Sequence, residues 1–309
     1  MSDPRPPAPV RPEVYVQAWC DGMGGRGSNE IFVASGGRET RPRLAYALNL
    51  ADLRPGLKVL DLGCGRGEVA ISCALAGAAL AAAVDYAPVP LERAAENAAA
   101  LNQAVNMAGS ALVLSRADAK ALPFPDQCFD RVFMLDIVEH LHEWELQQVW
   151  SEVRRLLAPG GYLVVHTLPN RWAIDYGYRL ARLLLRRLPA ESPDKRDLFH
   201  VNEQSPPQLR RSLVRAGLSC HVWLKDLILD QAGWWRRKGL AGEEAQELVY
   251  GRLLRPGWRS IYRLLTSLPT RLFLATDLFA LAWPSGPGPA ALERLPAGLA
   301  EKAASRLGG

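Results

Sequence analysis

Between residues 57 and 168 the chain alternates short apolar segments with amphipathic ones, and this alternation restricts the possible folds severely. The apolar segments have the length of buried strands: LKVLDL (57–62), LAAAVDY (80–86), ALVLSRAD (111–118), FDRVFMLD (129–136) and YLVVHTL (162–168). Helical spacing lies between them, over residues 68–77, 90–106 and 142–157. Strands that alternate with helices of this length predict an α/β fold with a parallel sheet and right-handed crossovers.

The loop after the first predicted strand carries three glycines at alternate positions, in the sequence VLDLGCGRGEVA (59–70). Glycine weakens a helix or strand by about 0.5–1 kcal/mol per residue relative to alanine. Three glycines within five residues therefore indicate that another group approaches this backbone closely. In a parallel α/β sheet, ligands bind beyond the carboxyl ends of the strands. The loop is therefore expected to bind a cofactor, although a tight turn without a ligand would also use glycine.

A glycine-rich turn of this kind is compatible with NAD, FAD or S-adenosylmethionine. The spacing here is GxGxG, whereas the dinucleotide fingerprint is GxGxxG. Glu68 follows the last glycine, where a pyrophosphate would favour bare N–H groups at a helix start. Both features favour S-adenosylmethionine, which carries positive charge.

The sequence VLDLGCGRGE resembles the first motif of class I S-adenosylmethionine-dependent methyltransferases. Further motifs of that family follow in order: RADAKALPFPDQCFDRVFMLD (116–136), LDIVEHL (135–141), VRRLLAPGGYLVV (153–165) and HVNEQSPPQLRRSLVRAGL (200–218). The resemblance extends over about residues 45–230, and FLATDLFALAWP (273–284) is similar to the last strand of the same fold. It implies a Rossmann-like seven-stranded, mostly parallel sheet with helices on both faces and an antiparallel last strand.

The resemblance also implies roles for individual residues around the cofactor. Asp61 would brace the glycine loop, and the glycines would let the backbone approach the methionine end. Asp85 would bind the ribose hydroxyls, Tyr86 would cover the adenine, and Asp118 would lie near the adenine amine, although a helix cap is a second interpretation for Asp118. The expected cofactor-binding residues are Asp61, Gly63, Gly65, Gly67, Asp85, Tyr86, Asp118, Ala119 and Asp136.

The reaction that the resemblance implies is in-line transfer of a methyl group, for which the protein supplies alignment and excludes water. A hydroxyl acceptor also needs a base, and histidine serves near neutral pH. His140, His166 and His200 all fall on the cofactor side of the predicted sheet and are the candidate catalytic residues. Asp136 and Glu139 are alternatives that could instead hold the methionine end of the cofactor.

The segment after the fourth predicted strand restricts the class of molecule that can accept the methyl group. Methyltransferases of nucleobase amines carry an Asn/Asp-Pro-Pro-Tyr/Phe motif there, whereas this chain has LDIVEHL and no Pro-Cys pair for attack on cytosine. VEHL resembles small-molecule methyltransferases of quinone biosynthesis and of cell-envelope polysaccharide clusters. O-methylation of a small-molecule, sugar or lipid-linked hydroxyl is therefore expected. An RNA methyltransferase, a C-methyltransferase and a non-catalytic S-adenosylmethionine-binding module remain alternatives.

The expected organisation is one catalytic domain with two insertions. Residues 1–12 are proline-rich and are expected to form a disordered tail. The methyltransferase domain is expected over residues 13–284, and a second tail over residues 285–309. Insertions at 170–199 and 231–271 are expected to overhang the active site, and residues 22–30 to form a mobile cover.

The insertions are basic: residues 171–271 contain 19 Arg and Lys against 10 Asp and Glu. Leucines and arginines at helical spacing over 179–188 predict a basic amphipathic helix. Three interpretations of these basic segments are open. The helix could pack on the core, or it could contact an anionic membrane or a lipid-linked substrate. RNA binding through Trp234 and Trp235 is the third interpretation and the least favoured.

The five cysteines form no CxxC pair, which argues against a disulfide framework or a zinc site and favours a reducing compartment. No metal is expected. The N-terminus lacks the features of a signal peptide, and the longest uncharged run, residues 69–84, is shorter than a membrane span. A cytoplasmic protein is expected, with peripheral contact at the inner membrane face as a further hypothesis. The acceptor and the oligomeric state are left open.

Overall fold

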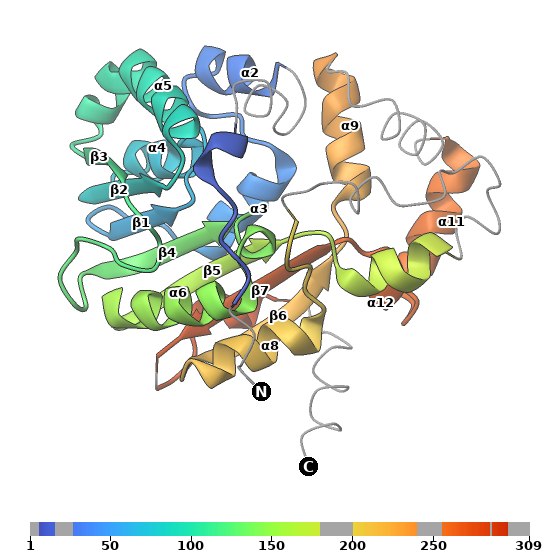
Figure 1. Ribbon diagram of the computed structural model, residues 1–309. Helices are drawn as coiled ribbons and strands as arrows, with labels where there is room; N and C mark the ends of the chain where they lie inside the picture. The colour runs from blue at the N-terminus through green and yellow to red at the C-terminus, as the bar shows by residue number, and fades with distance from the viewer. Residues whose placement is uncertain (1–5, 16–26, 180–199, 240–254, 285, 296–309) are drawn as a thin grey trace, which may run out of the picture.

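The protein is described by a computed structural model that covers residues 6–15, 27–179, 200–239, 255–284 and 286–295 of its 309 residues. At its centre is one seven-stranded sheet in the order β3-β2-β1-β4-β5-β7-β6 (Figure 1). The strands are β1 (Lys58–Leu62), β2 (Leu80–Asp85), β3 (Ala111–Arg116), β4 (Phe129–Leu135), β5 (Leu157–Thr167), β6 (Ser219–Lys225) and β7 (Asp277–Trp283).

The first five strands run parallel, and β7 lies antiparallel between β5 and β6. The predicted α/β class, the mostly parallel sheet and the antiparallel last strand are confirmed. Because β7 runs the opposite way, its first residue, Asp277, pairs at the same edge of the sheet as the last residues of β5. The carboxyl ends of the parallel strands and the start of β7 therefore form one edge.

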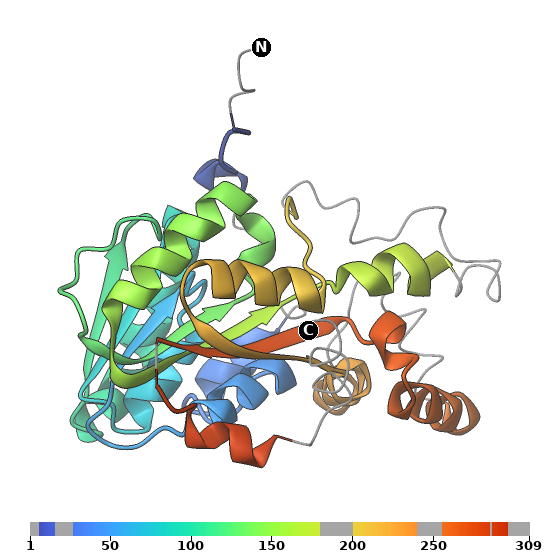
Figure 2. The same cartoon turned by 90° about the horizontal axis from the view of Figure 1, so that it is seen from below.

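Helices cover both faces of the sheet, as the alternating side chains of the strands require (Figure 2). Val59 of β1 lies in one apolar cluster and Leu60 in the other, and both are fully buried. The first cluster includes residues of α2 (Ser28–Ala34), α3 (Pro42–Leu50), α4 (Glu68–Leu75), α5 (Pro88–Met107) and η5 (Ala290–Arg294). The second cluster includes residues of α6 (Glu143–Leu156) and α8 (Pro206–Arg215).

The fifth strand begins earlier than the sequence predicts. The sequence predicts this strand over residues 162–168, but Leu157 already pairs with Phe129 of β4 before the register shifts. Gly161 lies so close to β4 that an added Cβ would be 2.9 Å from the carbonyl oxygen of Phe129. These residues thus form an irregular start of β5, for which glycine leaves the necessary room.

The segments that follow β5 and β6 extend beyond the edge where the parallel strands end. They contain η3 (Ala173–Gly177), α9 (Ile228–Lys238), α11 (Pro256–Ser267) and α12 (Arg271–Leu274). Figures 1 and 2 both show these helices at one side of the molecule, past the ends of β4 and β5. Within the described residues, no helix combines the length and hydrophobicity that crossing a membrane requires.

Part of the predicted N-terminal tail has a defined place. The indole N–H of Trp144 donates to the carbonyl oxygen of Pro7 at 3.1 Å, and a ring nitrogen of His142 lies 3.0 Å from that of Ala8. A short helix, η1 (Pro12–Val14), follows. Residues 6–12, expected to be disordered, thus lie across the start of α6.

Candidate functional site

The glycine loop joins β1 to α4 in a backbone conformation that only glycine adopts readily. Gly63, Gly65 and Gly67 have φ values of +75°, +52° and +76°. An added Cβ on Gly63 would lie 2.7 Å from Ile137, and one on Gly67 would lie 3.0 Å from Ala94. The loop is therefore fixed by its own backbone and by close packing on both sides.

Two aspartates hold the loop in place. Asp85, at the end of β2, accepts the N–H of Gly65 on one oxygen and that of Ala87 on the other, both at 2.9 Å. Asp61, at the end of β1, is buried and accepts the N–H of Ala70 in the first turn of α4 at 3.1 Å. Burial raises the pKa of Asp61 to about 7, against the effect of that hydrogen bond. Burial also raises the pKa of Asp85.

The predicted adenine-side residues lie along the neighbouring strand ends. Tyr86 is exposed directly after β2, and Arg116 donates to its carbonyl oxygen at 3.2 Å. Asp118 accepts the backbone N–H of Lys120 and forms an ion pair with its ammonium group at 3.1 Å. This local turn supplies a structural reason for an aspartate at 118. Ala119 is buried in the second core cluster.

Glu68 has two arginine partners: Arg66, which is close to it in the sequence, and Arg41, which the sequence does not reveal. Its carboxylate oxygens accept from Arg41 at 3.3 Å and from Arg66 at 3.1 Å, and all three side chains are buried. Asn97 of α5 donates to the carbonyl oxygen of Arg66. Because both arginines compensate the charge of Glu68, its repulsion of a pyrophosphate is weaker than the sequence argument assumed.

A buried ion network connects the ends of β4 and β5 with the start of β7. The two ring nitrogens of His166 contact Asp136 and, at 3.1 Å, Asp277. Arg43 of α3 bridges the same two aspartates at 3.3 and 3.0 Å. Arg43 and Asp277 were missed from the sequence because each lies more than 90 residues from its partners in the network. The only signal was a charged residue within an apolar strand.

The charges in this network determine its pKa values. Burial would lower the pKa of His166. The charge of Asp136 and the hydrogen bonds that the ring makes to both aspartates raise this pKa overall. Burial works against ionisation of Asp136 and Asp277, yet Arg43 and His166 lower the pKa of each. His166 is fully buried, and Asp136 has a φ of +58°, a strained conformation for a residue other than glycine.

The candidates Glu139, His140 and His200 come together beside this network. The ring centroids of His140 and His200 are 5.0 Å apart, and Tyr15 contacts His140 at 5.7 Å. Glu139 is 1% exposed and accepts the hydroxyl hydrogen of Thr167 at 2.7 Å. Its Oε1 has no hydrogen-bond partner among the described residues.

Burial and the charge of Asp136 raise the pKa of Glu139 to about 7, although His200 and Thr167 work in the opposite direction. A carboxyl group with this pKa exchanges protons at neutral pH. The structure therefore brings the predicted histidines His140 and His200 together with Glu139. His166 has another role, because both of its ring nitrogens contact aspartates inside the protein.

The same three residues contain potential metal ligands within 4.8 Å of one another. Two ligands of one zinc ion, at about 2.1 Å each, are no more than about 4.2 Å apart. The limit of 4.8 Å therefore includes both pairs of ligand atoms that could share an ion and pairs that could not.

The proposed RNA-stacking role of Trp234 and Trp235 is not compatible with their positions. Both indoles are buried on the inner side of α9, while residues 236–238 of the same helix are exposed. They pack against the protein because a helix at this place needs an apolar inner face. The predicted amphipathic helix over 179–188 lies almost wholly outside the described residues, as do most of the 22–30 segment and residues 240–254.

Residues 27–30 reach the glycine loop. The Ser28 hydroxyl accepts from Arg66 at 3.0 Å, and the side chains of Asn29 and Asn97 exchange two hydrogen bonds. The start of α2 is thus anchored over the loop.

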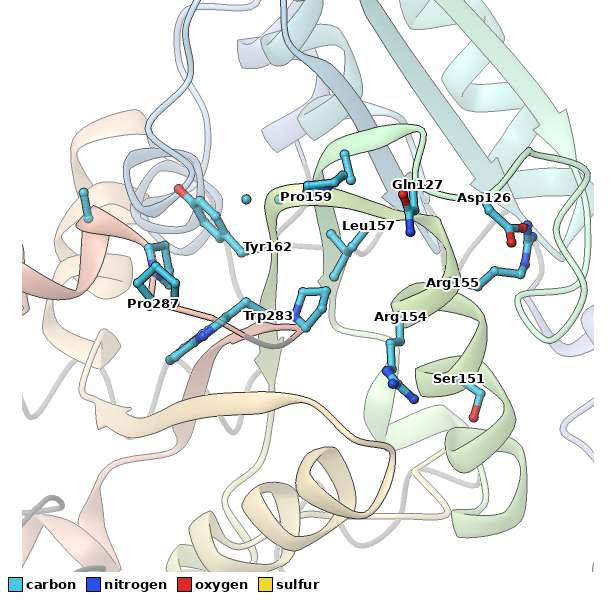
Figure 3. Close-up of a pocket in the computed structure, with 17 residues that line it drawn as sticks. Asp126, Gln127, Ser151, Arg154, Arg155, Leu157, Pro159, Tyr162, Trp283 and Pro287 are labelled. Atoms are coloured by element: carbon cyan, nitrogen blue, oxygen red, sulfur yellow. The ribbon is translucent and has the colours of Figure 1, made fainter.

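The hollow in Figure 3 belongs to another part of the molecule. It has a volume of about 890 Å³ and is lined by Gln127, Arg154, Pro159 and Trp283. Gln127 precedes β4, Pro159 lies at the beginning of β5, Trp283 ends the antiparallel β7, and Arg154 lies near the end of α6. The hollow is therefore at the edge of the sheet opposite the glycine loop.

Comparison with known proteins agrees with this geometry. Residues 60–165, from β1 to β5, match the family described as "Methyltransferase domain". The chain is 34% identical over 129 residues to 27-O-demethylrifamycin SV methyltransferase of Amycolatopsis mediterranei, an alignment of 41% of this chain and 44% of the relative. It is also 34% identical over 125 residues to the ubiquinone/menaquinone biosynthesis C-methyltransferase UbiE of Bordetella avium, covering 39% and 44%.

Among solved structures, the chain resembles phosphoethanolamine N-methyltransferase 2 of Haemonchus contortus in complex with S-adenosyl-L-methionine. The TM-score is 0.55 at 15% identity, over 89% of this chain and 60% of that one. The cyclase SpnF gives a TM-score of 0.50 at 20% identity, over 79% and 81%. At these identities the likeness shows the fold alone, and a fold hosts different chemistries.

The motifs, the sheet order and the family match define a class I methyltransferase fold with a cofactor loop after β1. Residues 60–165 of this chain therefore form a methyltransferase domain of the class I S-adenosylmethionine-dependent type. The alignment spans less than half the length of each of the two curated relatives, 44% in both cases.

Proposed function

We propose that this protein methylates a hydroxyl group of a small molecule, a sugar or a lipid-linked intermediate, with S-adenosylmethionine as the methyl donor. The observation that carries the proposal is the group of Glu139, His140 and His200 at the end of β4. It supplies proton acceptors at the sheet edge where the glycine loop also ends. An attacking hydroxyl has to lose its proton, and this group would take it.

The loop suits the cofactor for reasons of charge and space. Asp85, at the end of β2, and Asp118, after β3, are half-buried, while Tyr86 is exposed. Carboxylates of this kind accept hydrogen bonds from ribose hydroxyls and tolerate a cationic ligand. Gly63, Gly65 and Gly67 would bring backbone N–H groups to the methionine end, and Ala119 would line the adenine side.

When bound, S-adenosylmethionine supplies an electrophilic methyl group on its sulfonium. The protein would contribute position and proton transfer. We assign His140 as the group that takes the hydroxyl proton, with His200 beside it. Glu139 would stabilise the protonated histidine through its charge, and the Asp136–His166–Asp277–Arg43 network would hold the end of β4 in place.

A C-methyltransferase is an alternative that differs in the atom that is methylated. C-methylation has support from relatives named as C-methyltransferases, among them UbiE and the sterol 24-C-methyltransferase ERG6B of Gibberella zeae, which is 31% identical over 121 residues. O-methylation has support from the rifamycin relative. The same proton-accepting group would serve an O-methyl transfer directly.

The basic surplus over 171–271 supports an acceptor with a phosphate or a lipid anchor, met at the surface of an anionic membrane. The insertions at 170–199 and 231–271 would then provide the acceptor site, within a single catalytic domain of residues 13–284. This also favours a location in the cytoplasm at the inner membrane face.

The test uses S-adenosylmethionine with a ¹³C-labelled methyl group and a panel of sugar, quinol and polyprenyl-phosphate-linked acceptors. The methyl chemical shift of the product distinguishes oxygen from carbon as the methylated atom. An O-methyl product that is lost in His140→Asn, with cofactor binding retained, supports the proposal. A C-methyl product refutes it. Cofactor binding with no product from any acceptor would favour a non-catalytic binding module.

A further inference from the structure

The exposed apolar side chains of this protein are concentrated in one corner. Of the large apolar side chains that are exposed among the described residues, seven belong to three short elements, η3, α11 and α12, and to the turn between the last two. We call them the apolar corner: Tyr176, Trp258, Ile261, Leu264, Leu265, Leu268 and Phe273. Their exposed fractions are 38–62%, and a patch of this kind marks an interaction site.

The corner is continuous from η3 to α12. The rings of Tyr176 and Phe273 meet edge to face with centroids 5.8 Å apart. Asn170, just before η3, donates to the carbonyl oxygens of Leu272 and Ala275 at 2.9 and 3.0 Å. Helix α12 contacts both η3 and α11, and Figures 1 and 2 both show it next to η3. The exposed rings thus rest on a fixed framework.

Helix α11 does not use its apolar face for folding. None of its residues is buried. Tyr262 faces the body of the protein, where its hydroxyl group donates to Asp226 at 3.1 Å. Trp258, Ile261 and Leu265 recur at helical spacing on the exposed side. A helix with an apolar face directed away from the core is suited to lie on another surface.

The charges within α11, α12 and the turn between them are of one sign. Arg255, Arg259 and Arg263 follow one another at intervals of four residues, so that they lie along one flank of α11, and Arg271 begins α12. Residues 255–276 contain no Asp or Glu. An amphipathic helix with aromatic and leucine side chains on one face and arginines on the opposite face matches the interfacial helices that bind anionic lipid.

The position of the corner connects it with the active site. Helix α12 leads through Ala275 into β7, whose first residue, Asp277, belongs to the ion network at the ends of β4 and β5. The corner therefore lies beyond the same edge of the sheet as the glycine loop. A surface bound there would be next to the side from which an acceptor enters.

We propose that the apolar corner docks on a bilayer that contains anionic phospholipids. Trp258, Ile261 and Leu264 enter the headgroup and acyl boundary, while Arg259 and Arg263 contact lipid phosphates. The interaction is peripheral. The docking itself is independent of the methyl transfer, and only its consequence, delivery of a lipid-linked acceptor, rests on the proposed function.

The experiment is co-sedimentation of the full chain with vesicles of phosphatidylglycerol and phosphatidylcholine at about 3:7, and with vesicles of phosphatidylcholine alone. The full chain should bind the anionic vesicles and lose binding at high salt, because salt screens the arginines. The double variants Ile261→Ser/Leu264→Ser and Arg259→Gln/Arg263→Gln should each bind the anionic vesicles about tenfold more weakly or less. Val214→Ser removes an equally exposed apolar side chain from α8 and should bind as the wild type does.

Equal binding by the wild type and both double variants, or no binding of the wild type to anionic vesicles, overturns the proposal. A concentration-dependent dimer in sedimentation velocity that Ile261→Ser/Leu264→Ser abolishes, without vesicle binding, assigns the corner to a second copy of the chain and also overturns it. Titration of S-adenosylmethionine into the same samples separates the two proposals. Cofactor binding with no vesicle binding is a failure of the docking alone, whereas vesicle binding with no methyl transfer is a failure of the proposed function alone.

Discussion

Replacing His166 by asparagine tests whether the buried ion network holds the active-site edge together. In the folded protein the protonated ring and Arg43 face two carboxylates, Asp136 and Asp277. Asparagine leaves two carboxylates with one cation. The His166 side chain is 0% exposed, Asp277 is 2% exposed, and Asp136 is 23% exposed, so water compensates the loss at one carboxylate only.

Removal of one partner from a buried ion pair costs about 3–5 kcal/mol. We expect His166→Asn to lie at the lower end of this range, at about 3 kcal/mol, because Asp136 is partly hydrated. Adding Asp277→Asn should restore at least about 1 kcal/mol, since it removes the carboxylate that has lost its partner.

The cost should also depend on pH, with a definite sign. The pKa of His166 is raised in the folded state, so its protonation adds stability that is fully present below its ordinary pKa of about 6.5 and is lost as pH rises through the folded value. The difference between wild type and His166→Asn should therefore be largest near pH 6 and shrink in alkaline solution. Urea unfolding at a series of pH values measures it. A cost below about 1 kcal/mol, unchanged across pH, would refute the charged network.

Two further substitutions follow from the loop and from the proton-accepting group. Gly63→Ala should lower the free energy of unfolding by about 2–4 kcal/mol, because it places alanine in a left-handed conformation and a Cβ 2.7 Å from Ile137. Gly109 is the control, since it has a similar φ of +72° and an added Cβ would have no atom within 4 Å. Gly109→Ala should lower the free energy of unfolding by only about 1–2 kcal/mol in the same urea titration. Glu139→Gln should lower kcat/KM most above about pH 7, where Glu139 is ionised in the wild type and stabilises protonated His140. Because burial raises this pKa, the stability of the wild type relative to Glu139→Gln should fall as pH rises from about 4.3 through about 7, and a pH-independent difference in unfolding would contradict the assignment.

Much of the fold is predictable because it depends on local patterns. Alternating apolar segments identify the parallel strands, and the glycine loop at 63–67 requires only the conformations that its own residues adopt. The antiparallel β7 was found through its resemblance to a known last strand. The start of β5 was not found, because glycine at 161 signals a turn in the sequence while its reason is the nearby carbonyl of Phe129.

The candidate site was only partly predictable for the same physical reason. His140 and Glu139 follow a strand and could be placed from the sequence, whereas Arg43 and Asp277 meet His166 only through tertiary packing. Trp234 and Trp235 lie next to basic residues in the sequence, which suggested a binding surface. Both side chains are buried because they lie on the side of the helix that faces the core. Local sequence identifies which groups are available, and the fold decides which of them meet.

The central claim is that the glycine loop and Asp85 hold S-adenosylmethionine, and calorimetric titration tests it most directly. S-adenosylmethionine and its demethylated product should bind the wild type with Kd values in the ~µM range, and NAD should not bind. Asp85→Ala should weaken both adenosyl ligands by about tenfold or more, whereas Asp126→Ala, at the opposite edge of the sheet, should leave them unchanged. Circular dichroism establishes that each variant is folded. Absence of binding to the wild type, or equal binding by folded Asp85→Ala, would contradict the account.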